Sequence, residues 1–264
     1  MKQLLKLEKV NWTRKGQRIL SDINWQVNQG EQWAILGLNG SGKTSILNIV
    51  TGYTYPTSGK VNVLGTEFGQ ASIPKVREEI GFMSSFLERF GSTFNKQSVK
   101  NIILSGKYSS VGVYSNQTYT DTDQALAESL LEDLGISNLQ DKAYAYLSQG
   151  EKRKALIGRS LMNQPKLLIL DEPCSGLDLQ AREDVLELID TIAARRCHLL
   201  YVTHYIEEIT DSITHVALIQ DGSILAKGPK RDILTDELLS QTFKIPLKVR
   251  WEHQRPWITI QPKL

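Results

Sequence analysis

The stretch GLNGSGKT, Gly37 to Thr44, has the clearest chemical signature in this sequence. It fits the pattern Gly-x-x-x-x-Gly-Lys-Ser/Thr, in which glycines let consecutive backbone N–H groups close around phosphate oxygens. Lys43 would direct its charge to β- and γ-phosphates, and the Thr44 hydroxyl would be a ligand for Mg²⁺. A glycine-rich structural turn is the alternative, but chance produces the full pattern in a chain of this length only about once in a hundred.

Two adjacent acids follow an apolar run in LLILDEP. A buried strand there would deliver Asp171 and Glu172 to its carboxyl end, where ligands collect in open α/β sheets. Asp171 would hold Mg²⁺ through water, and Glu172 would be the general base that orients an attacking water. Adjacent acids are often ordinary surface charge, but the four apolar residues before them favour the functional interpretation.

A histidine ends a second apolar run, HLLYVTH. If both runs are strands of one sheet, His204 lies at the same edge, within reach of a γ-phosphate. A lone histidine after a strand is usually structural, and only the two nucleotide motifs favour a catalytic role here.

A second candidate phosphate site lies in LSQGEKRKA, residues 147–155. Ser148 and Gly150 stand where a helix would begin, and they would offer a hydroxyl and backbone N–H groups to an anion. Taken alone, these residues are better explained as an ordinary capped helix start.

The surrounding patterns predict the elements that position these residues. Apolar runs predict buried strands in QWAILGLNG, KLLILDEP and HLLYVTH, a further strand in SGKVNVLG, and helices over residues 44–51 and in LQAREDVLELIDTIAARR. Hairpins are predicted for Leu4 to Val27 around RKGQR, for HVALIQDGSILAKG with its Asp-Gly pair, and for PLKVRWEHQRPWITI. Residues 85–161 are predicted to be mainly helical, and DTDQALAESLLEDLG is the clearest helix, capped by Asp or Thr and ended by Gly135.

Composition bounds the class of protein. With 264 residues, 41% hydrophobic and 23% charged, the chain fits one α/β unit with an inserted subdomain. A formal net charge of +2 is too mild for a nucleic-acid surface, so no DNA or RNA partner is expected. The start MKQLLKLEKV is too charged for a secretory signal and no apolar run is long enough to span a bilayer. The expected location is cytoplasmic, peripheral at the cytoplasmic face of the cell membrane.

The order of the motifs resembles the ATP-binding cassette (ABC) ATPases: phosphate loop, then Leu-Ser-x-Gly, then strand-Asp-Glu, then His. The resemblance covers about residues 4–235. It implies an α/β fold, a P-loop NTPase with a RecA-like core sheet, an antiparallel β subdomain and a helical subdomain. The implied nucleotide-binding domain spans residues 1–240, with the helical subdomain at about 86–160, and residues 241–264 form a hairpin-like extension.

In this family the LSQGE signature reaches the nucleotide bound by a second copy, which implies a twofold homodimer with two ATP molecules between its subunits. Ser148 and Gly150 would therefore contact the partner subunit's ATP. The SGLD stretch, Ser175 to Asp178, resembles the loop that crosses this interface, where Asp178 would connect one site to the other. By the same resemblance the nucleotide cradle comprises Gly37, Asn39, Gly40, Ser41, Gly42, Lys43, Thr44 and Ser45.

The sequence departs from the family pattern at three places. Gln149 and Glu151 change the usual L-S-G-G-Q, and we expect Glu151 to face solvent or a cation. Ser85 stands where the family has a Gln that contacts the Mg²⁺ and water region and senses the membrane partner. An aromatic residue usually stacks on adenine; Arg14 takes that position here, while Trp12 is either a second candidate or a buried structural residue.

The resemblance implies Mg²⁺-dependent ATP hydrolysis, in which Lys43, Glu172 and His204 are catalytic and Thr44 and Asp171 bind the metal. The first hypothesis is the ATP-binding subunit of an ABC transporter with separate membrane permease subunits. The alternative is a soluble ABC ATPase that acts on a macromolecular complex, which Ser85 favours. A non-catalytic nucleotide switch is disfavoured by Glu172 and His204. NIILSGKYSSVGVY and the missing Gln also resemble a subgroup of single-cassette proteins, some of which are named for molybdate uptake.

Overall fold

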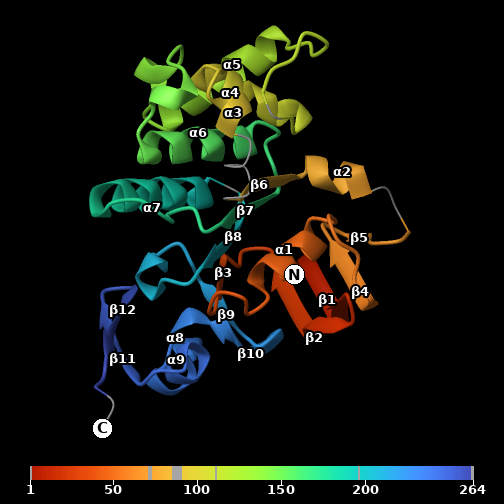
Figure 1. Ribbon diagram of the computed structural model, residues 1–264, viewed down its shortest axis with the longest axis vertical. Helices are drawn as coiled ribbons and strands as arrows, with labels where there is room; N and C mark the ends of the chain where they lie inside the picture. The colour runs from red at the N-terminus through yellow and green to blue at the C-terminus, as the bar shows by residue number, and fades with distance from the viewer. Residues whose placement is uncertain (1, 71–72, 85–90, 111, 196, 263–264) are drawn as a thin grey trace. The chain divides into compact units, whose positions relative to one another are not determined.

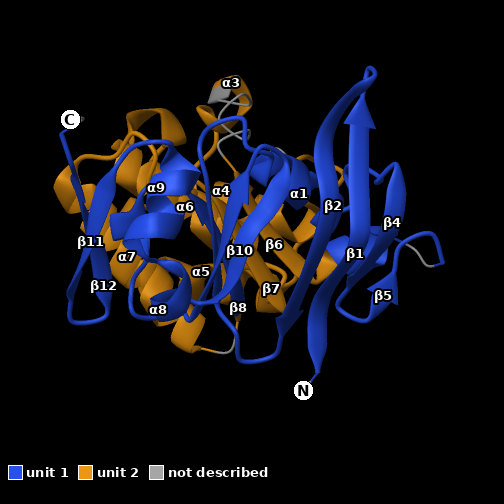
Figure 2. Cartoon of the chain, turned by 90° about the horizontal axis from the view of Figure 1, so that it is seen from below, with its two compact units in different colours: residues 1–77, 198–264 blue, residues 78–197 orange. Residues whose placement is uncertain are grey.

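The computed structural model describes residues 2–70, 73–84, 91–110, 112–195 and 197–262 (Figure 1). The chain divides into two compact units, which we describe separately (Figure 2). Unit 1 comprises residues 1–77 and 198–264, and unit 2 comprises residues 78–197. Within the described ranges, no helix is both long and apolar enough to cross a membrane.

Unit 1 opens with the predicted hairpin, formed by β1 (Gln3–Arg14) and β2 (Gln17–Asn28). The turn residues Lys15 and Gly16 both have positive φ angles, 49° and 79°, as a tight two-residue turn requires. β4 (Ser58–Val63) and β5 (Thr66–Glu67) extend this antiparallel sheet in the order β2-β1-β4-β5. The sequence patterns did not identify β5.

Four further strands of unit 1 lie in the order β10-β9-β3-β8. They are β3 (Trp33–Leu36), β8 (His198–Thr203), β9 (His215–Gln220) and β10 (Ser223–Pro229). β3 is parallel to both β8 and β9, and its four residues are all buried. The short helix α1 (Lys43–Val50) follows β3 through the glycine-rich loop. This is the predicted strand, turn and helix.

The C-terminal part of unit 1 contains three short helical segments and a hairpin. The helical segments are η5 (Ile206–Glu208), α8 (Lys230–Ile233) and α9 (Asp236–Phe243). β11 (Leu247–Glu252) and β12 (Arg255–Ile260) pair in antiparallel register, so the predicted hairpin is confirmed. The boundaries proposed for a separate extension at 241–264 stay a prediction.

Unit 2 combines a parallel strand pair with a helical region. The strands are β6 (Ile80–Ser84) and β7 (Leu167–Asp171). The longer helices are α4 (Val99–Leu104), α5 (Asp121–Asp133), α6 (Gln149–Leu161) and α7 (Leu179–Ala194). Shorter segments are α3 (Gly91–Phe94), η2 (Ser105–Tyr108), η3 (Ser137–Leu139) and η4 (Tyr144–Tyr146), and α2 (Ile73–Glu78) runs across the division between the units.

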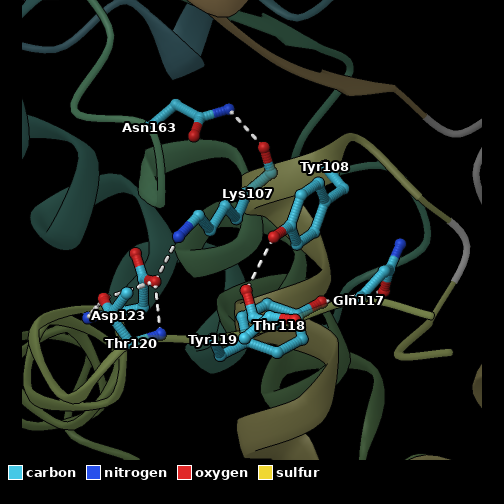
Figure 3. A network of polar contacts seen from close by, with 8 residues as sticks. All are labelled: Lys107, Tyr108, Gln117, Thr118, Tyr119, Thr120, Asp123 and Asn163. Atoms are coloured by element: carbon cyan, nitrogen blue, oxygen red, sulfur yellow. Dashed lines mark hydrogen bonds and ion pairs between the residues drawn. The ribbon is translucent and has the colours of Figure 1, made fainter. Parts of the chain in front are cut away.

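Helix α5 begins in a polar network that also holds the preceding loop (Figure 3). Thr120 is the N-cap, and Asp123 returns its carboxylate to the Thr120 N–H at 2.8 Å. The Lys107 ammonium pairs with the same carboxylate, so η2 is tied to the start of α5. The Tyr108 hydroxyl donates to the Thr118 carbonyl at 2.6 Å. The loop between η2 and α5 is therefore fastened at both of its ends.

Candidate functional site

The phosphate loop places a nearly buried lysine between β3 and α1. Lys43 is 5% exposed, and its ammonium donates to the carbonyl oxygens of Gly37 (2.8 Å) and Leu38 (3.2 Å). Gly42 occupies the N-cap of α1 at φ 111°, so no side chain caps this helix, and no acidic residue lies in its first turn. The start of α1 thus presents backbone N–H groups and the positive charge of Lys43, with no acidic residue in its own first turn, and this arrangement suits a phosphate.

Close contacts explain why two of the loop positions are glycine. A Cβ at Gly37 would lie 2.4 Å from the Ile219 carbonyl oxygen, and one at Gly42 would lie 2.8 Å from a Leu20 methyl carbon. The Ser41 hydroxyl oxygen is buried and has no hydrogen-bond partner in the described part of the chain. A buried hydroxyl without a partner is costly, and an oxygen of a bound phosphate would satisfy it.

The turn between β9 and β10 supports the phosphate loop through backbone hydrogen bonds. Gly222 donates its N–H to the Ser41 carbonyl (2.9 Å), and its own carbonyl accepts from the Ser21 N–H (2.8 Å). A Cβ at Gly222 would lie 2.2 Å from the Ile19 carbonyl oxygen. The Asp-Gly pair predicts the hairpin turn from the sequence. No local sequence pattern predicts that this turn contacts the phosphate loop, which lies nearly two hundred residues earlier in the chain.

His204 and the phosphate loop follow the carboxyl ends of two neighbouring strands, β8 and β3. Leu36 of β3 pairs with Thr203 of β8 in parallel register, so Gly37 and His204 are the next residues at one edge of the sheet. This agrees with the predicted position of His204. The role assigned to His204 stays a prediction.

A buried glutamate, which sequence reasoning missed, organises the residues around His204. Glu208 is 2% exposed, and its carboxylate accepts from the hydroxyls of Thr203 (2.6 Å) and Tyr201 (2.8 Å). Thr203 in turn accepts the Tyr205 N–H at 3.0 Å. The residues on either side of His204 are therefore linked to each other through one hydroxyl.

The two predicted acidic residues lie at the carboxyl end of β7 in unit 2. Asp171 is 4% exposed and accepts from the Ser84 hydroxyl at 3.1 Å, because Ser84 is its register partner on β6. Glu172 has a φ of 51°, a backbone region that side-chain-bearing residues rarely occupy and that is found often at active sites. Ser85 and its substitution for the family Gln lie outside the described residues.

Ser148 begins α6 with a reciprocal capping box. Its hydroxyl accepts the Glu151 N–H (3.2 Å), and the Glu151 carboxylate accepts the Ser148 N–H (2.7 Å). The Lys142 ammonium lies 3.9 Å from the same carboxylate, so Glu151 meets a cation as expected. The Ser-x-x-Glu spacing could have predicted this box from the sequence. Ser148 itself is exposed, so its hydroxyl hydrogen can still be donated to a ligand.

The loop after Glu172 is tied to the signature helix. Arg153 of α6 is 5% exposed and donates to the Ser175 carbonyl at 2.9 Å. Asp178 caps α7 by accepting the Ala181 N–H at 2.8 Å, which gives it a local structural role as well as the predicted interface role. A Cβ at Gly150 would lie 3.1 Å from the Ala181 Cβ, so a small residue is needed where α6 meets α7.

Three further predicted residues of unit 1 are exposed or half-buried. Arg14 closes β1 opposite Gln17 and is exposed, whereas Trp12 lies opposite Leu20 and is half-buried. Asn39 is exposed in the phosphate loop. Lys43, Thr44 and His204 belong to unit 1, and Ser148, Gly150, Asp171 and Glu172 belong to unit 2.

Comparison with known proteins identifies the class. The ABC transporter family model matches residues 20–175, and the chain belongs to the ABC transporter ATP-binding proteins. It is 42% identical over 259 residues to the ABC transporter ATP-binding protein YlmA of Bacillus subtilis, covering 97% of each chain. It is 37% identical over 214 residues to ModF of Escherichia coli, covering 78% of this chain and 42% of that relative.

Solved structures support the same fold. An ATP-binding cassette of an ABC transporter in its ADP conformation superposes with a TM-score of 0.79 at 22% identity, covering 91% of this chain and 98% of that chain. CbiO1 from Clostridium perfringens, part of the ABC transporter complex CbiONQ, superposes with a TM-score of 0.78 at 25% identity, covering 91% and 94%. The predicted family and fold class are confirmed, and the molybdate-associated subgroup stays a prediction.

Proposed function

We propose that this chain is the ATP-hydrolysing subunit of an ABC transporter and energises transport through separate membrane permease subunits at the cytoplasmic face. The observation that carries the proposal is the phosphate loop, where the buried ammonium of Lys43 and the uncapped start of α1 suit a triphosphate. The chain also spans 97% of its Bacillus relative, which is named an ABC transporter ATP-binding protein. The proposed ligand is thus ATP, and the bond that is cleaved joins its β- and γ-phosphates.

The proposed roles follow from the chemistry of each side chain. Lys43 binds the β- and γ-phosphates, and Glu172 orients the attacking water and accepts its proton. His204 donates to the γ-phosphate and holds it in line. Thr44, exposed in the first turn of α1, and Asp171 present the hard oxygen donors that suit Mg²⁺, which when bound would neutralise phosphate charge. The proposed cradle comprises Arg14, Gly37, Asn39, Gly40, Ser41, Gly42, Lys43, Thr44 and Ser45.

We further propose a homodimer in which Ser148 and Gly150 contact the ATP held by the partner copy. Two large apolar side chains support an interface here: Tyr146, just before the signature, is 77% exposed, and Leu179, just after Asp178, is 69% exposed. Exposed apolar residues beside both interface motifs are expected of a surface that closes on a second copy. The domain boundaries 1–240 and 241–264 belong to this proposal too.

Glu172→Gln tests the catalytic assignment. The amide cannot accept the proton, so turnover should fall by about a hundredfold or more while ATP binding is kept. Phosphate release and equilibrium ATP binding are measured on the same preparations. Glu187→Gln makes the same change at an exposed position of α7 and should leave both quantities unchanged. Near-normal turnover in Glu172→Gln would remove Glu172 from the mechanism.

A second candidate is a soluble ABC ATPase that acts on a macromolecular complex, and Ser85 in place of the family Gln is the feature that favours it. Purification of the tagged chain from detergent-solubilised membranes separates the two. Integral-membrane proteins recovered with it support the transporter, and recovery of a soluble assembly instead supports the alternative.

A further inference from the structure

The C-terminal hairpin reaches the turn that follows His204. Arg255, the first residue of β12, donates from its guanidinium Nε to the Glu207 carbonyl oxygen at 2.6 Å. Glu207 lies in η5, three residues beyond His204, and β12 packs against this segment. All of these residues belong to unit 1, coloured blue in Figure 2.

The turn that Arg255 contacts is rigidly connected to His204. Ile206 and Ile209 are fully buried and anchor the turn in the core. The Thr203 hydroxyl accepts the Tyr205 N–H and donates to the carboxylate of Glu208, the last residue of the turn. Only Tyr205 lies between His204 and the first residue of η5. A displacement of η5 should therefore also displace the backbone on both sides of His204.

The hairpin itself is fastened well enough to serve as a support. The Arg231 guanidinium of α8 lies 3.8 Å from the centre of the Trp251 ring and donates to the His253 carbonyl at 2.6 Å. The Val249 N–H donates to the Asp236 carboxylate at 2.7 Å. These contacts hold β11 and the hairpin turn against α8 and α9, so Arg255 projects from a fixed base.

We propose that Arg255 is a positioning residue for His204. By holding the Glu207 carbonyl it fixes η5, and through the Glu208–Thr203 link it fixes the direction in which His204 meets the γ-phosphate. This inference rests on the proposed function for the role of His204. It makes the C-terminal hairpin a support of the catalytic apparatus, through the contact of Arg255 with η5.

The first test observes His204 directly. Imidazole NMR signals are recorded for the full chain and its variants, and the His204 signal is assigned by its loss in His204→Ala. Arg255→Ala should shift or broaden that signal, and Arg255→Lys, which keeps a donor, should largely restore it. Arg250→Ala removes the same charge from an exposed position of the neighbouring strand and should leave the signal in place. An unshifted His204 signal in Arg255→Ala overturns the proposal.

The second test asks whether the effect passes through His204. Arg255→Ala should lower kcat for ATP hydrolysis by about tenfold, as expected for a misplaced catalytic group, while KM stays within about twofold. In a His204→Ala background the same substitution should cause no further loss. An equal loss in both backgrounds contradicts positioning. A wild-type chain that hydrolyses no ATP would refute the proposed function, and the NMR signals would still decide the role of Arg255.

Discussion

Lys43 shows how a single residue is prepared for its ligand before the ligand arrives. Because Lys43 is only 5% exposed, its ammonium loses most of its hydration, and the carbonyl oxygens of Gly37 and Leu38 replace part of it. Carbonyl dipoles hold the charge in place but do not neutralise it. A phosphate would add negative charge next to this ammonium, and the burial that restrains the lysine strengthens its attraction to an anion.

Gly222, which contacts the phosphate loop, is predicted to be important for stability. Gly222→Ala should lower the free energy of unfolding by about 1–3 kcal/mol more than Gly16→Ala. Both glycines have positive φ, 78° and 79°, but a Cβ would meet the Ile19 carbonyl at 2.2 Å only at Gly222, whereas Gly16 faces open space. Urea unfolding measures the difference between the two variants.

The same pair of variants should differ in nucleotide binding. Only Gly222 donates to the Ser41 carbonyl of the phosphate loop, so Gly222→Ala should weaken ATP binding and Gly16→Ala should not. Equal stability losses with unchanged binding would show that the turn does not support the loop.

At the scale of an element, the start of α5 couples a helix cap to an ion pair (Figure 3). The Lys107 ammonium, with the hydroxyl and N–H of Thr120, holds the pKa of Asp123 at about 2, below its usual 3.8. The charged carboxylate is thus favoured in the folded chain. Its contribution to stability is complete above about pH 4 and is lost as the pH falls through about 2.

Asp123→Asn should therefore destabilise the protein by about 1 kcal/mol near neutral pH. The gap from wild type should shrink between about pH 4 and pH 2, because the wild-type carboxylate is then protonated as well. Chemical unfolding across this range measures the gap. Asp121→Asn, at an exposed position in the same helical turn, is the matched control and should show a smaller effect throughout. A gap that does not change with pH would contradict the coupling.

For the whole molecule, the sequence was informative wherever a local pattern decides the structure. Alternation and the Asp-Gly pair predict the hairpins, and the apolar runs predict β3, β7 and β8. The contacts that support the site are different in kind: Gly222 with Ser41, Glu208 with Thr203, and Arg255 with Glu207. Each is set by tertiary packing, and two of the three join distant parts of the sequence, where residue type gives no signal.

The proposed homodimer makes the last prediction, in which each defect is placed on one subunit. Lys43→Ala disables the phosphate loop of its own subunit, and Ser148→Arg blocks what that subunit offers to its partner. Each homodimer should be inactive. A heterodimer of the two retains one composite site, in which the loop of the Ser148→Arg chain meets the signature of the Lys43→Ala chain. With random pairing, half of the dimers carry one working site of two, so the rate should recover to about a quarter of wild type.

A mixture of Lys43→Ala with Glu172→Gln is the matched control. In the proposed arrangement both residues serve the nucleotide bound to their own subunit, so every site in that heterodimer contains one defect and activity should not return. Two different affinity tags verify heterodimer formation, and bound ATP is counted per heterodimer so that binding is measured independently of turnover. If ATP hydrolysis recovers in both mixtures, activity is restored by something other than a site shared between the subunits. A Ser148→Arg homodimer that hydrolyses ATP at the wild-type rate would show that Ser148 does not complete the partner's site. A verified heterodimer of the first mixture that binds ATP but does not hydrolyse it would contradict the composite site, because the one pairing predicted to be intact would then be inactive.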